Sequence, residues 1–197
     1  MNLLTRPRGA APMLLSWLGA TAALAAPVRY DIDPNHTYPS FEADHLGGLS
    51  VWRGKFNKSA GQIVLDKAAG TGGLDVVVEM DSLDFGLDQM NAVARGQDIF
   101  DVERFPQARF RGQLEGFAEG APSRAVGEFT LHGVTQPLTL EIRQFKCMPH
   151  PLFKRELCGA DAFATFQRDA FGIDAGKRFG FRMDVILRIQ VEAVAAE

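Results

Sequence analysis

Strict alternation of apolar and polar residues near the C-terminus constrains this chain more than any other feature. Between residues 179 and 193 every second position is apolar, and most of the positions between them carry charged or amide side chains. A period of two places the apolar side chains on one face of a β-strand, whereas a helix would scatter them around its axis. The pattern therefore predicts a long strand with one buried and one exposed face.

Shorter alternating segments recur along the rest of the chain. They cover residues 28–33, 41–45, 74–80, 110–114 and 138–142, with further candidates at 62–65, 127–131 and 161–167. Turns rich in glycine, proline and aspartate separate them, so we expect about eight or nine strands. These two-faced strands favour an all-β fold in which an antiparallel sheet closes into a barrel, because closure leaves no unpaired edge.

One segment, residues 87–95, has helical spacing instead. Leu87, Met90 and Ala94 fall on one face, Asp88 lies near the start and Gly96 follows the end. These signals predict a short helix, and residues 98–103 could add a single turn. The sequence contains no internal repeat, low-complexity stretch or linker, so we expect one domain.

The first 25 residues resemble a secretory signal peptide. Arg6 and Arg8 precede an apolar run, and residues 23–25 (ALA) supply a small-x-small cleavage pattern. An uncleaved membrane anchor is the alternative, although the run is short for a span. We expect a cleaved signal peptide over residues 1–25, a mature domain over residues 26–197 and export to the periplasm. No second apolar run approaches the length of a membrane span.

The mature segment is mildly acidic. Residues 26–197 contain 19 basic and 24 acidic residues, a net charge of −5, without a basic cluster. This charge argues against nucleic acid or an anionic membrane surface as the partner. A homodimer is left open.

Sequence motifs of common enzyme classes are missing from the chain. The motifs of serine hydrolases, zinc proteases, P-loop nucleotide hydrolases and dinucleotide-binding enzymes do not occur. The four histidines, His36, His45, His132 and His150, are scattered rather than placed one helical turn apart. We therefore predict no enzyme and no catalytic residue. A zinc site assembled from distant strands is the alternative.

Three polar residues are candidates for contact with the polar head of a ligand. His45 shares a predicted strand face with Phe41, so it either fills the core or meets a head group. His36 follows a predicted turn, and stabilising that turn is its other interpretation. Arg53 shares a strand face with Lys55, which is either a solvated basic face or a site that neutralises an anionic head.

The two cysteines are Cys147 and Cys158. Their separation is too wide for a CxxC redox motif, and a haem-attachment CxxCH is missing. In an oxidising compartment an even cysteine count favours a disulfide. Pro149 and Pro151 disfavour regular strand pairing, so we expect the bond to close a loop. A metal site that combines the cysteines with His150 would lack a fourth local ligand.

The 15 phenylalanines have two interpretations. A barrel of about eight strands holds either side chains alone or one elongated ligand. On composition alone an ordinary aromatic core is favoured.

Four sequence blocks occur in an order that suggests a family. They are YDIDPNHTYPSFEADHLGGLSVWRGKF (30–56), FDVERFPQARF (100–110), GEFTLHGVTQPLTL (127–140) and CGADAFATFQRDAFGI (158–173). Over residues 28–192 the chain resembles the YceI-like family of lipid/polyisoprenoid-binding periplasmic proteins. The resemblance implies an extended eight-stranded antiparallel lipocalin-like barrel with a short helix near one end. It also implies a tunnel for a long apolar chain, such as a polyisoprenoid, an isoprenoid quinone or a fatty amide.

The resemblance turns inward-facing apolar residues into candidates for the tunnel wall. We expect residues 147–158 to lie outside the tunnel, and no cofactor or metal other than a bound lipid or quinone. The expected function is non-enzymatic binding of an amphiphilic isoprenoid-type lipid. Alternatives are an enzyme or accessory factor of periplasmic lipid or quinone metabolism, and a stress-protective protein. The predicted wall residues are Phe41, Val78, Phe110, Leu114, Phe129, Leu140, Phe181 and Val185.

Overall fold

Eleven antiparallel strands form one continuous sheet in the computed structural model, which describes residues 26–197. The predicted signal peptide lies outside the described residues. Single 3₁₀ turns are η1 (Met80–Ser82), η2 (Arg168–Phe171) and η3 (Lys177–Phe179). The strands are β1 (Val28–Ile32), β2 (Tyr38–His45), β3 (Ser50–Phe56), β4 (Ser59–Asp66), β5 (Thr71–Glu79), β6 (Leu83–Asp84), β7 (Gln107–Glu115), β8 (Arg124–Leu131), β9 (Val134–Pro149), β10 (Glu156–Gln167) and β11 (Asp184–Ala195).

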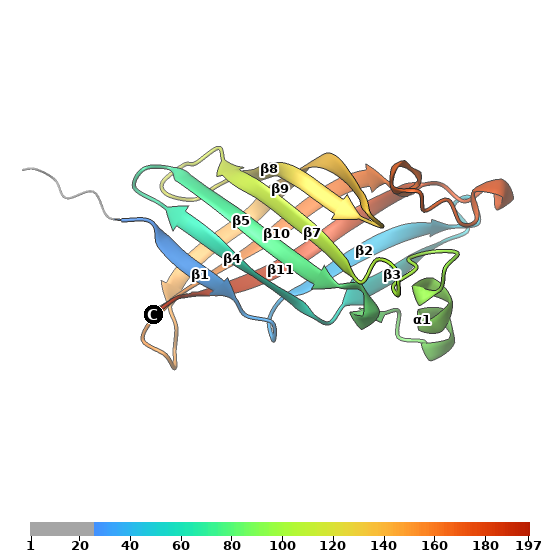
Figure 1. Cartoon of the computed structure of the whole chain (residues 1–197). Helices are drawn as coiled ribbons and strands as arrows, with labels where there is room; N and C mark the ends of the chain where they lie inside the picture. Colours follow the sequence, from blue (N-terminus) through green and yellow to red (C-terminus); the bar gives the residue numbers. More distant parts are fainter. Residues whose placement is uncertain (1–25) are drawn as a thin grey trace, which may run out of the picture.

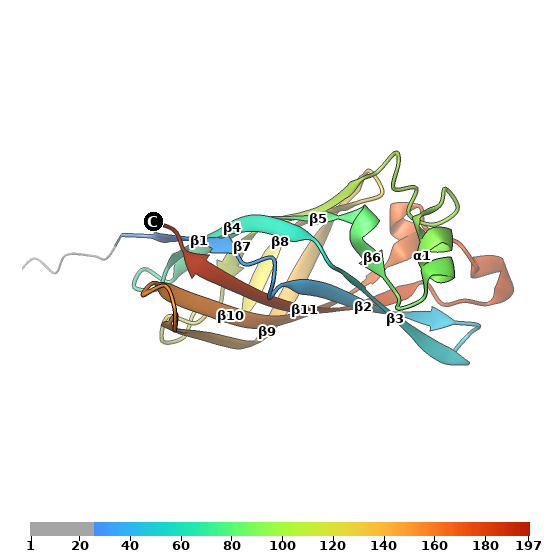
Figure 2. The same cartoon turned by 90° about the horizontal axis from the view of Figure 1, so that it is seen from below.

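The sheet closes on itself through β1. This strand pairs with β4 along one edge and with the end of β11 along the other, where Tyr30 lies opposite Ala195. The closed ring therefore has eight strands, in the order β1, β4, β5, β7, β8, β9, β10 and β11. Figures 1 and 2 show an elongated barrel. The predicted antiparallel eight-stranded barrel is confirmed.

Strand β11 pairs with β10 along its length, and its first half pairs on the other edge with β2, in a register that places Val185 opposite Ala43. Strands β2, β3 and β6 extend the sheet in this direction. Helix α1 (Asp88–Arg95) lies at this end of the barrel, far from the C-terminus (Figure 1). Ala94 of α1 is buried in a cluster with Phe41 and Leu83. The predicted short helix is confirmed.

The structure corrects three details of the sequence prediction. The sheet has eleven strands instead of the expected eight or nine, because the two-residue β6 is added and β3, where Arg53 and Lys55 were already expected to share a strand face, is a separate strand. The strand predicted from residue 179 begins at Asp184, since Gly176 and Gly180 adopt left-handed conformations around η3. Residues 98–103 form turns rather than a helical turn.

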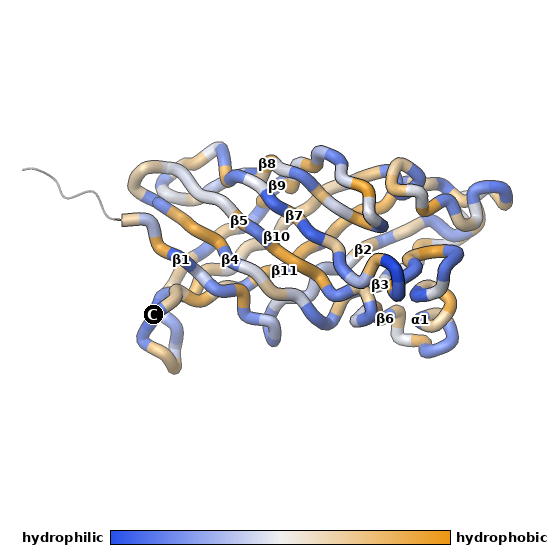
Figure 3. The backbone as a smooth tube through the Cα atoms, viewed as in Figure 1, coloured by the Kyte–Doolittle hydropathy of each residue, from blue (hydrophilic) through white to orange (hydrophobic). Residues whose placement is uncertain are grey.

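Side chains alternate between the interior and the outer surface as the period of two requires. Along β7, Ala108, Phe110 and Leu114 are buried, and the residues between them include Arg109 and Arg111, which pair with Asp75 on the outer face. Figure 3 shows hydrophobic and hydrophilic residues alternating along the strands. Within residues 26–197, none of the helices is long and apolar enough to cross a membrane.

Two glycines allow the paired strands β7 and β8 to approach closely. Gly112 and Gly127 face each other in the register of this pair. A Cβ atom on Gly127 would lie 2.2 Å from the Arg111 carbonyl oxygen and 2.5 Å from the Gly112 Cα. Both are backbone atoms, so a side-chain rotation cannot relieve the clash. The close approach of these two strands therefore requires glycine at position 127.

We predict that Gly127→Ala destabilises the protein by about 1–3 kcal/mol, the usual cost of overpacking. Gly159→Ala is the matched strand control, because a Cβ there would have its nearest neighbours at 3.7 Å, an ordinary contact. Urea unfolding of both variants measures the difference in free energy. Equal stability of the two variants would contradict the close approach of β7 and β8.

Candidate ligand-binding cavity

The barrel encloses a cavity of about 460 Å³. Side chains from all eight ring strands, from β2 and β3 and from α1 line it, and nearly all of them are apolar. The volume falls within the range of about 300–1,000 Å³ that is common for small-molecule sites. An interior of this kind favours an apolar ligand, because polar groups placed there would lose their hydration without replacement.

The eight residues predicted for a tunnel wall all line this cavity. Seven project from strands, whereas Phe181 comes from the connection between η3 and β11. The alternation of the strands thus locates interior positions correctly. A contact of these residues with a ligand stays a prediction.

Phenylalanine rings form much of the wall near α1. The Phe41 ring centroid lies 5.7 Å from that of Phe56 and 5.5 Å from that of Phe85. The Phe100 ring lies 6.5 Å from Phe41, and all four residues line the cavity. Tilted and edge-to-face contacts of this kind fix the rings relative to one another. The phenylalanine content therefore builds a wall around a space instead of filling it.

The two ends of the cavity differ. At the end away from α1, the lining residues Tyr30, Leu65 and Pro122 are buried. Phe117, in the β7–β8 connection, packs against the same cluster and helps to cover this end. At the other end Val93 of α1 lines the cavity although 56% of its surface is exposed. The cavity therefore reaches the protein surface beside α1, and we call this end the mouth.

Asp44 is a charged residue of the mouth whose side chain is fully buried. Its carboxylate accepts hydrogen bonds from the Gly47 amide at 2.9 Å and the Arg182 amide at 2.9 Å. The Arg182 guanidinium donates a third bond at 3.1 Å. The Arg182 amide contributes most to holding the pKa of Asp44 below its usual value, against the opposing effect of burial. Asp44 therefore fastens the β2–β3 turn to the segment before β11.

Two of the three predicted head-group contacts lie outside the cavity wall. The His36 Nδ1 atom is 2.7 Å from the Asp33 carboxylate in an exposed turn. This hydrogen bond raises the pKa of His36. Arg53 is exposed and its Nε donates to Glu42 at 3.1 Å. For His36 this contact agrees with the turn-stabilising role that was its alternative. Arg53 is solvent-exposed, as its alternative stated, and pairs with Glu42 in addition.

His45 comes nearer to the cavity. Its ring stacks on Trp52 with centroids 4.4 Å apart and meets Phe181 edge-on at 5.2 Å. Both neighbours line the cavity, so His45 supports the wall of the mouth from behind. His132 occupies the turn between β8 and β9, where its Nδ1 lies 3.1 Å from the Phe171 carbonyl oxygen.

Arg168 is a further cavity residue that sequence reasoning missed. It directly follows β10 and continues the inward series of that strand, Ala162, Ala164 and Phe166. The alternation along β10 therefore indicated that Arg168 faces the interior. An arginine, however, is normally assigned to a solvent-exposed face.

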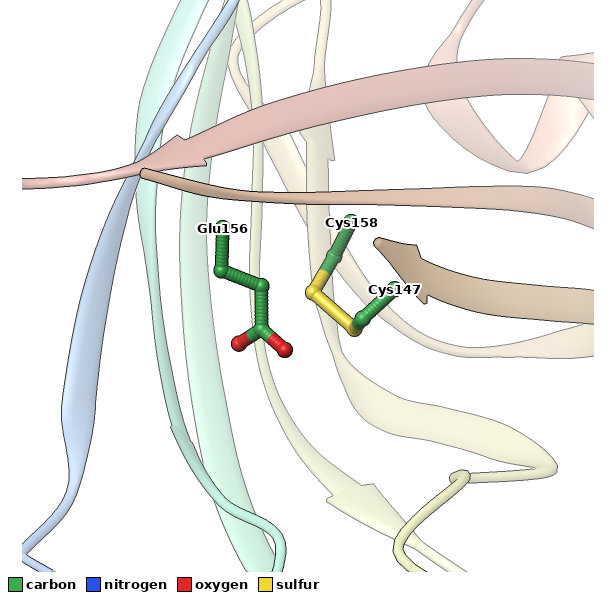
Figure 4. Close-up of side chains that lie close together, drawn as sticks. All are labelled: Cys147, Glu156 and Cys158. Atoms are coloured by element: carbon green, nitrogen blue, oxygen red, sulfur yellow. A yellow bond between two sulfur atoms is a disulfide. The ribbon is translucent and has the colours of Figure 1, made fainter. Parts of the chain in front are cut away.

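The predicted disulfide between Cys147 and Cys158 is confirmed. The two residues lie opposite each other on β9 and β10, with their Cα atoms 4.0 Å apart (Figure 4). Strand pairing continues past the bond to Pro149 and Glu156, so the unpaired tip is shorter than expected. Cys158 is 8% exposed and lines the cavity, because it shares the inward face of β10. The expectation that residues 147–158 lie wholly outside the tunnel is wrong at this position.

A polar network lies beside the disulfide at the covered end of the cavity. The Tyr30 hydroxyl donates to Glu156, and the Lys67 ammonium lies 2.6 Å from the other oxygen of the same carboxylate. Burial raises the pKa of Tyr30, and the contact with Glu156 adds to the effect. Burial opposes ionisation of Glu156, but Lys67 and Tyr30 together hold its pKa below the usual value. These groups satisfy one another.

Glu156 and the two cysteine sulfurs lie within 4.8 Å of one another (Figure 4). Both sulfurs are joined in the disulfide, and metal binding requires free thiolates. His150, the histidine considered for a metal site, accepts hydrogen bonds from the Leu152 and Phe153 amides in the hairpin tip. The oxidised hairpin is therefore a covalent cross-link rather than a metal centre.

We predict that replacing both cysteines with serine lowers the free energy of unfolding by about 3 kcal/mol. The chain-entropy model gives this value for a closed loop of about twelve residues. Guanidinium unfolding of the variant and the oxidised protein tests it. An unchanged unfolding midpoint would show that the bond does not constrain the unfolded chain.

We predict that the contribution of Asp44 to stability disappears on acidification. Its folded-state pKa is lowered, so the stabilisation is present above the unfolded-state pKa of about 3.9 and is lost as the pH falls through the folded-state pKa. Asp44→Asn should therefore be less stable than the wild type at neutral pH, and the gap should narrow below about pH 4. Urea unfolding across this range measures the gap. A gap that stays constant with pH would contradict the role of the carboxylate.

Comparisons with known proteins identify relatives of this chain. A family model described as the YceI-like domain matches residues 30–193. UPF0312 proteins of Yersinia pestis and Photorhabdus laumondii are 33% and 32% identical over 123 and 124 residues. Each match covers 62% of this chain, and the chain spans 63% and 64% of the length of these relatives.

Two solved structures share the fold. BcnA of Burkholderia cenocepacia superposes with a TM-score of 0.64 at 20% identity, over 82% of this chain and 98% of that one. A polyisoprenoid binding domain from Saccharophagus degradans superposes with a TM-score of 0.61 at 14% identity, over 86% and 99% of the two chains. At these identities the likeness concerns the fold.

Proposed function

Since this chain belongs to the YceI-like family, we propose that it is an exported, non-enzymatic protein that holds a long isoprenoid-type lipid in its barrel. The ligand would be a polyisoprenoid, an isoprenoid quinone or a similar amphiphile. The observation that carries the proposal is the apolar cavity that runs from α1 to the Cys158 end of the barrel. The description of the Saccharophagus degradans neighbour as a polyisoprenoid binding domain supports this ligand class.

Burial of an alkyl chain supplies enough free energy for such binding. Each methylene group that leaves water contributes about 0.8 kcal/mol before the cost of ordering the ligand. The phenylalanine wall is held by ring–ring contacts, so little reorganisation accompanies binding. A long flexible hydrocarbon therefore fits this interior better than a compact polar metabolite does.

The polar groups around the cavity favour binding over catalysis. Asp44 accepts three hydrogen bonds from the protein itself, and Glu156 is bound by Tyr30 and Lys67. Lowered pKa values keep both carboxylates ionised, whereas a general acid needs a pKa near the working pH. This arrangement supports a carrier rather than an enzyme.

The disulfide supports export. Structural disulfides form and persist in oxidising compartments such as the periplasm and are rare in the cytosol. Together with the signal-like residues 1–25, the Cys147–Cys158 bond makes the periplasm the proposed location.

We predict that Ala162→Phe expels the lipid while the barrel stays folded. Ala162 is 6% exposed and lies between Ile142 and Ile189 on the cavity wall. A phenylalanine ring there would replace several methylene groups of the ligand, so binding should weaken about tenfold or more. Mass spectrometry of organic extracts from freshly purified protein should detect lipid with the wild type and little with the variant.

Thr165→Phe is the control, because Thr165 is exposed on the outer face of the same strand. It should keep the wild-type lipid content. Thermal unfolding confirms that both variants are folded. Reproducibly lipid-free wild-type protein, or equal lipid content in Ala162→Phe, would refute the proposal.

A further inference from the structure

Arg168 places a guanidinium in the cavity wall near the mouth. Its Nη1 donates to the Ile173 carbonyl oxygen at 3.1 Å and its Nη2 to the Ala175 carbonyl oxygen at 2.7 Å. The side chain is half-buried, and Ile173 and Ala175 also line the cavity. A guanidinium has five N–H donors, so these two bonds leave donor capacity unused.

The charge of Arg168 has no contact counter-ion in the described part of the chain. The nearby carboxylates of Asp44 and Asp169 are bound instead by Arg182 and by Lys177, whose Nζ lies 2.7 Å from Asp169. Asp174 also acts on Arg168, but from beyond ion-pair distance. Burial lowers the pKa of Arg168. A partly desolvated cation without such a partner is costly, and protein interiors normally avoid it.

Arg109, the other arginine along the cavity, does not share this situation. It lies on the outer face of β7, where its Nε donates to Asp75 at 2.7 Å. Arg168 is thus distinguished by its inward position and by the lack of a contact ion pair among the described residues. Both properties suit a site that is completed by a ligand.

We propose that Arg168 binds the polar head of the lipid through an acceptor oxygen, with the tail running from the mouth toward Cys158. The inference rests on the proposed lipid-binding function and adds the head-group chemistry to it. Phosphate, carboxylate and carbonyl oxygens all accept from a guanidinium, and its planar fork suits the first two best. The mouth is the end where a polar head can keep contact with water.

A purely structural role for Arg168 predicts something different. Its bonds to Ile173 and Ala175 fasten the segment after η2, so loss of the side chain could loosen the mouth. A looser mouth would lower the affinity for every ligand alike, with or without a polar head group. Loss of a head-group contact would lower the affinity only for ligands that carry the polar head group.

The test compares three ligands of equal chain length: geranylgeranyl phosphate, geranylgeraniol and the corresponding hydrocarbon. Dissociation constants are measured by displacement of a fluorescent probe from lipid-stripped protein. We expect Arg168→Gln to weaken the binding of geranylgeranyl phosphate about tenfold or more, because it removes a hydrogen bond to a charged group. The hydrocarbon affinity should change less than about twofold. Arg168→Lys keeps the charge without the fork and should lie in between.

Arg178→Gln is the matched control, because Arg178 is exposed near the mouth, beside the Phe179 ring. It should leave all three affinities unchanged. If Arg168→Gln weakens binding of the phosphate only, Arg168 recognises an anionic head group. If it weakens binding of the alcohol equally, Arg168 recognises any head group with an acceptor oxygen. Equal weakening of phosphate and hydrocarbon, or no weakening of either, overturns the role of Arg168. Wild-type protein that binds none of the three would overturn the lipid-binding function itself, so the two failures are distinguishable.

Discussion

Closure of the sheet by the short pairing of β1 with β11 is the constraint on which the rest of the structure depends. Only a few residues make this contact, with Tyr30 opposite Ala195 and Ile32 opposite Ala193. Without it β1 and β11 would both present unpaired backbone groups, and the inward faces would be open to water. Closure converts a row of apolar faces into the wall of one enclosed space. The cavity is therefore a property of the ring, which no single strand possesses.

A ring of eight strands is wide enough to leave space inside only where its side chains do not meet across the axis. Small residues such as Ala108, Ala125 and Ala162 alternate with aromatic rings along the wall. The rings pack mainly against one another near α1, as Phe41 does with Phe85. Apolar area is thus buried within the wall, and an elongated space is kept along the barrel.

The sequence predicts the fold well because the alternation of apolar and polar residues is a local property. In a β-strand successive side chains point to opposite faces, so the alternation alone determines which residues face inward. It places Phe110 and Leu140 on the interior without knowledge of the tertiary structure. It fails for residues 179–183, where the alternation persists but Gly176 and Gly180 turn the backbone left-handed. The alternation alone does not predict the cavity, since its volume depends on closure, and the expectation of a tunnel came only from the family resemblance. Arg168 was missed because a charged residue is normally assigned to a solvent-exposed face, although the alternation along β10 places it on the inward face.

Under the proposed lipid-binding function, the difference between the two ends of the cavity would give a ligand its orientation. The apolar wall is similar along its length, so it cannot by itself distinguish the two directions of a chain. At the covered end the polar groups bond with one another, because Tyr30 and Lys67 both bind Glu156. At the mouth Asp44 accepts three hydrogen bonds from the protein, whereas Arg168 keeps unused donors and has no contact ion pair among the described residues. The proposed role of Arg168 therefore implies that an amphiphile whose head accepts hydrogen bonds would be stabilised in one direction only, with its tail directed toward Cys158.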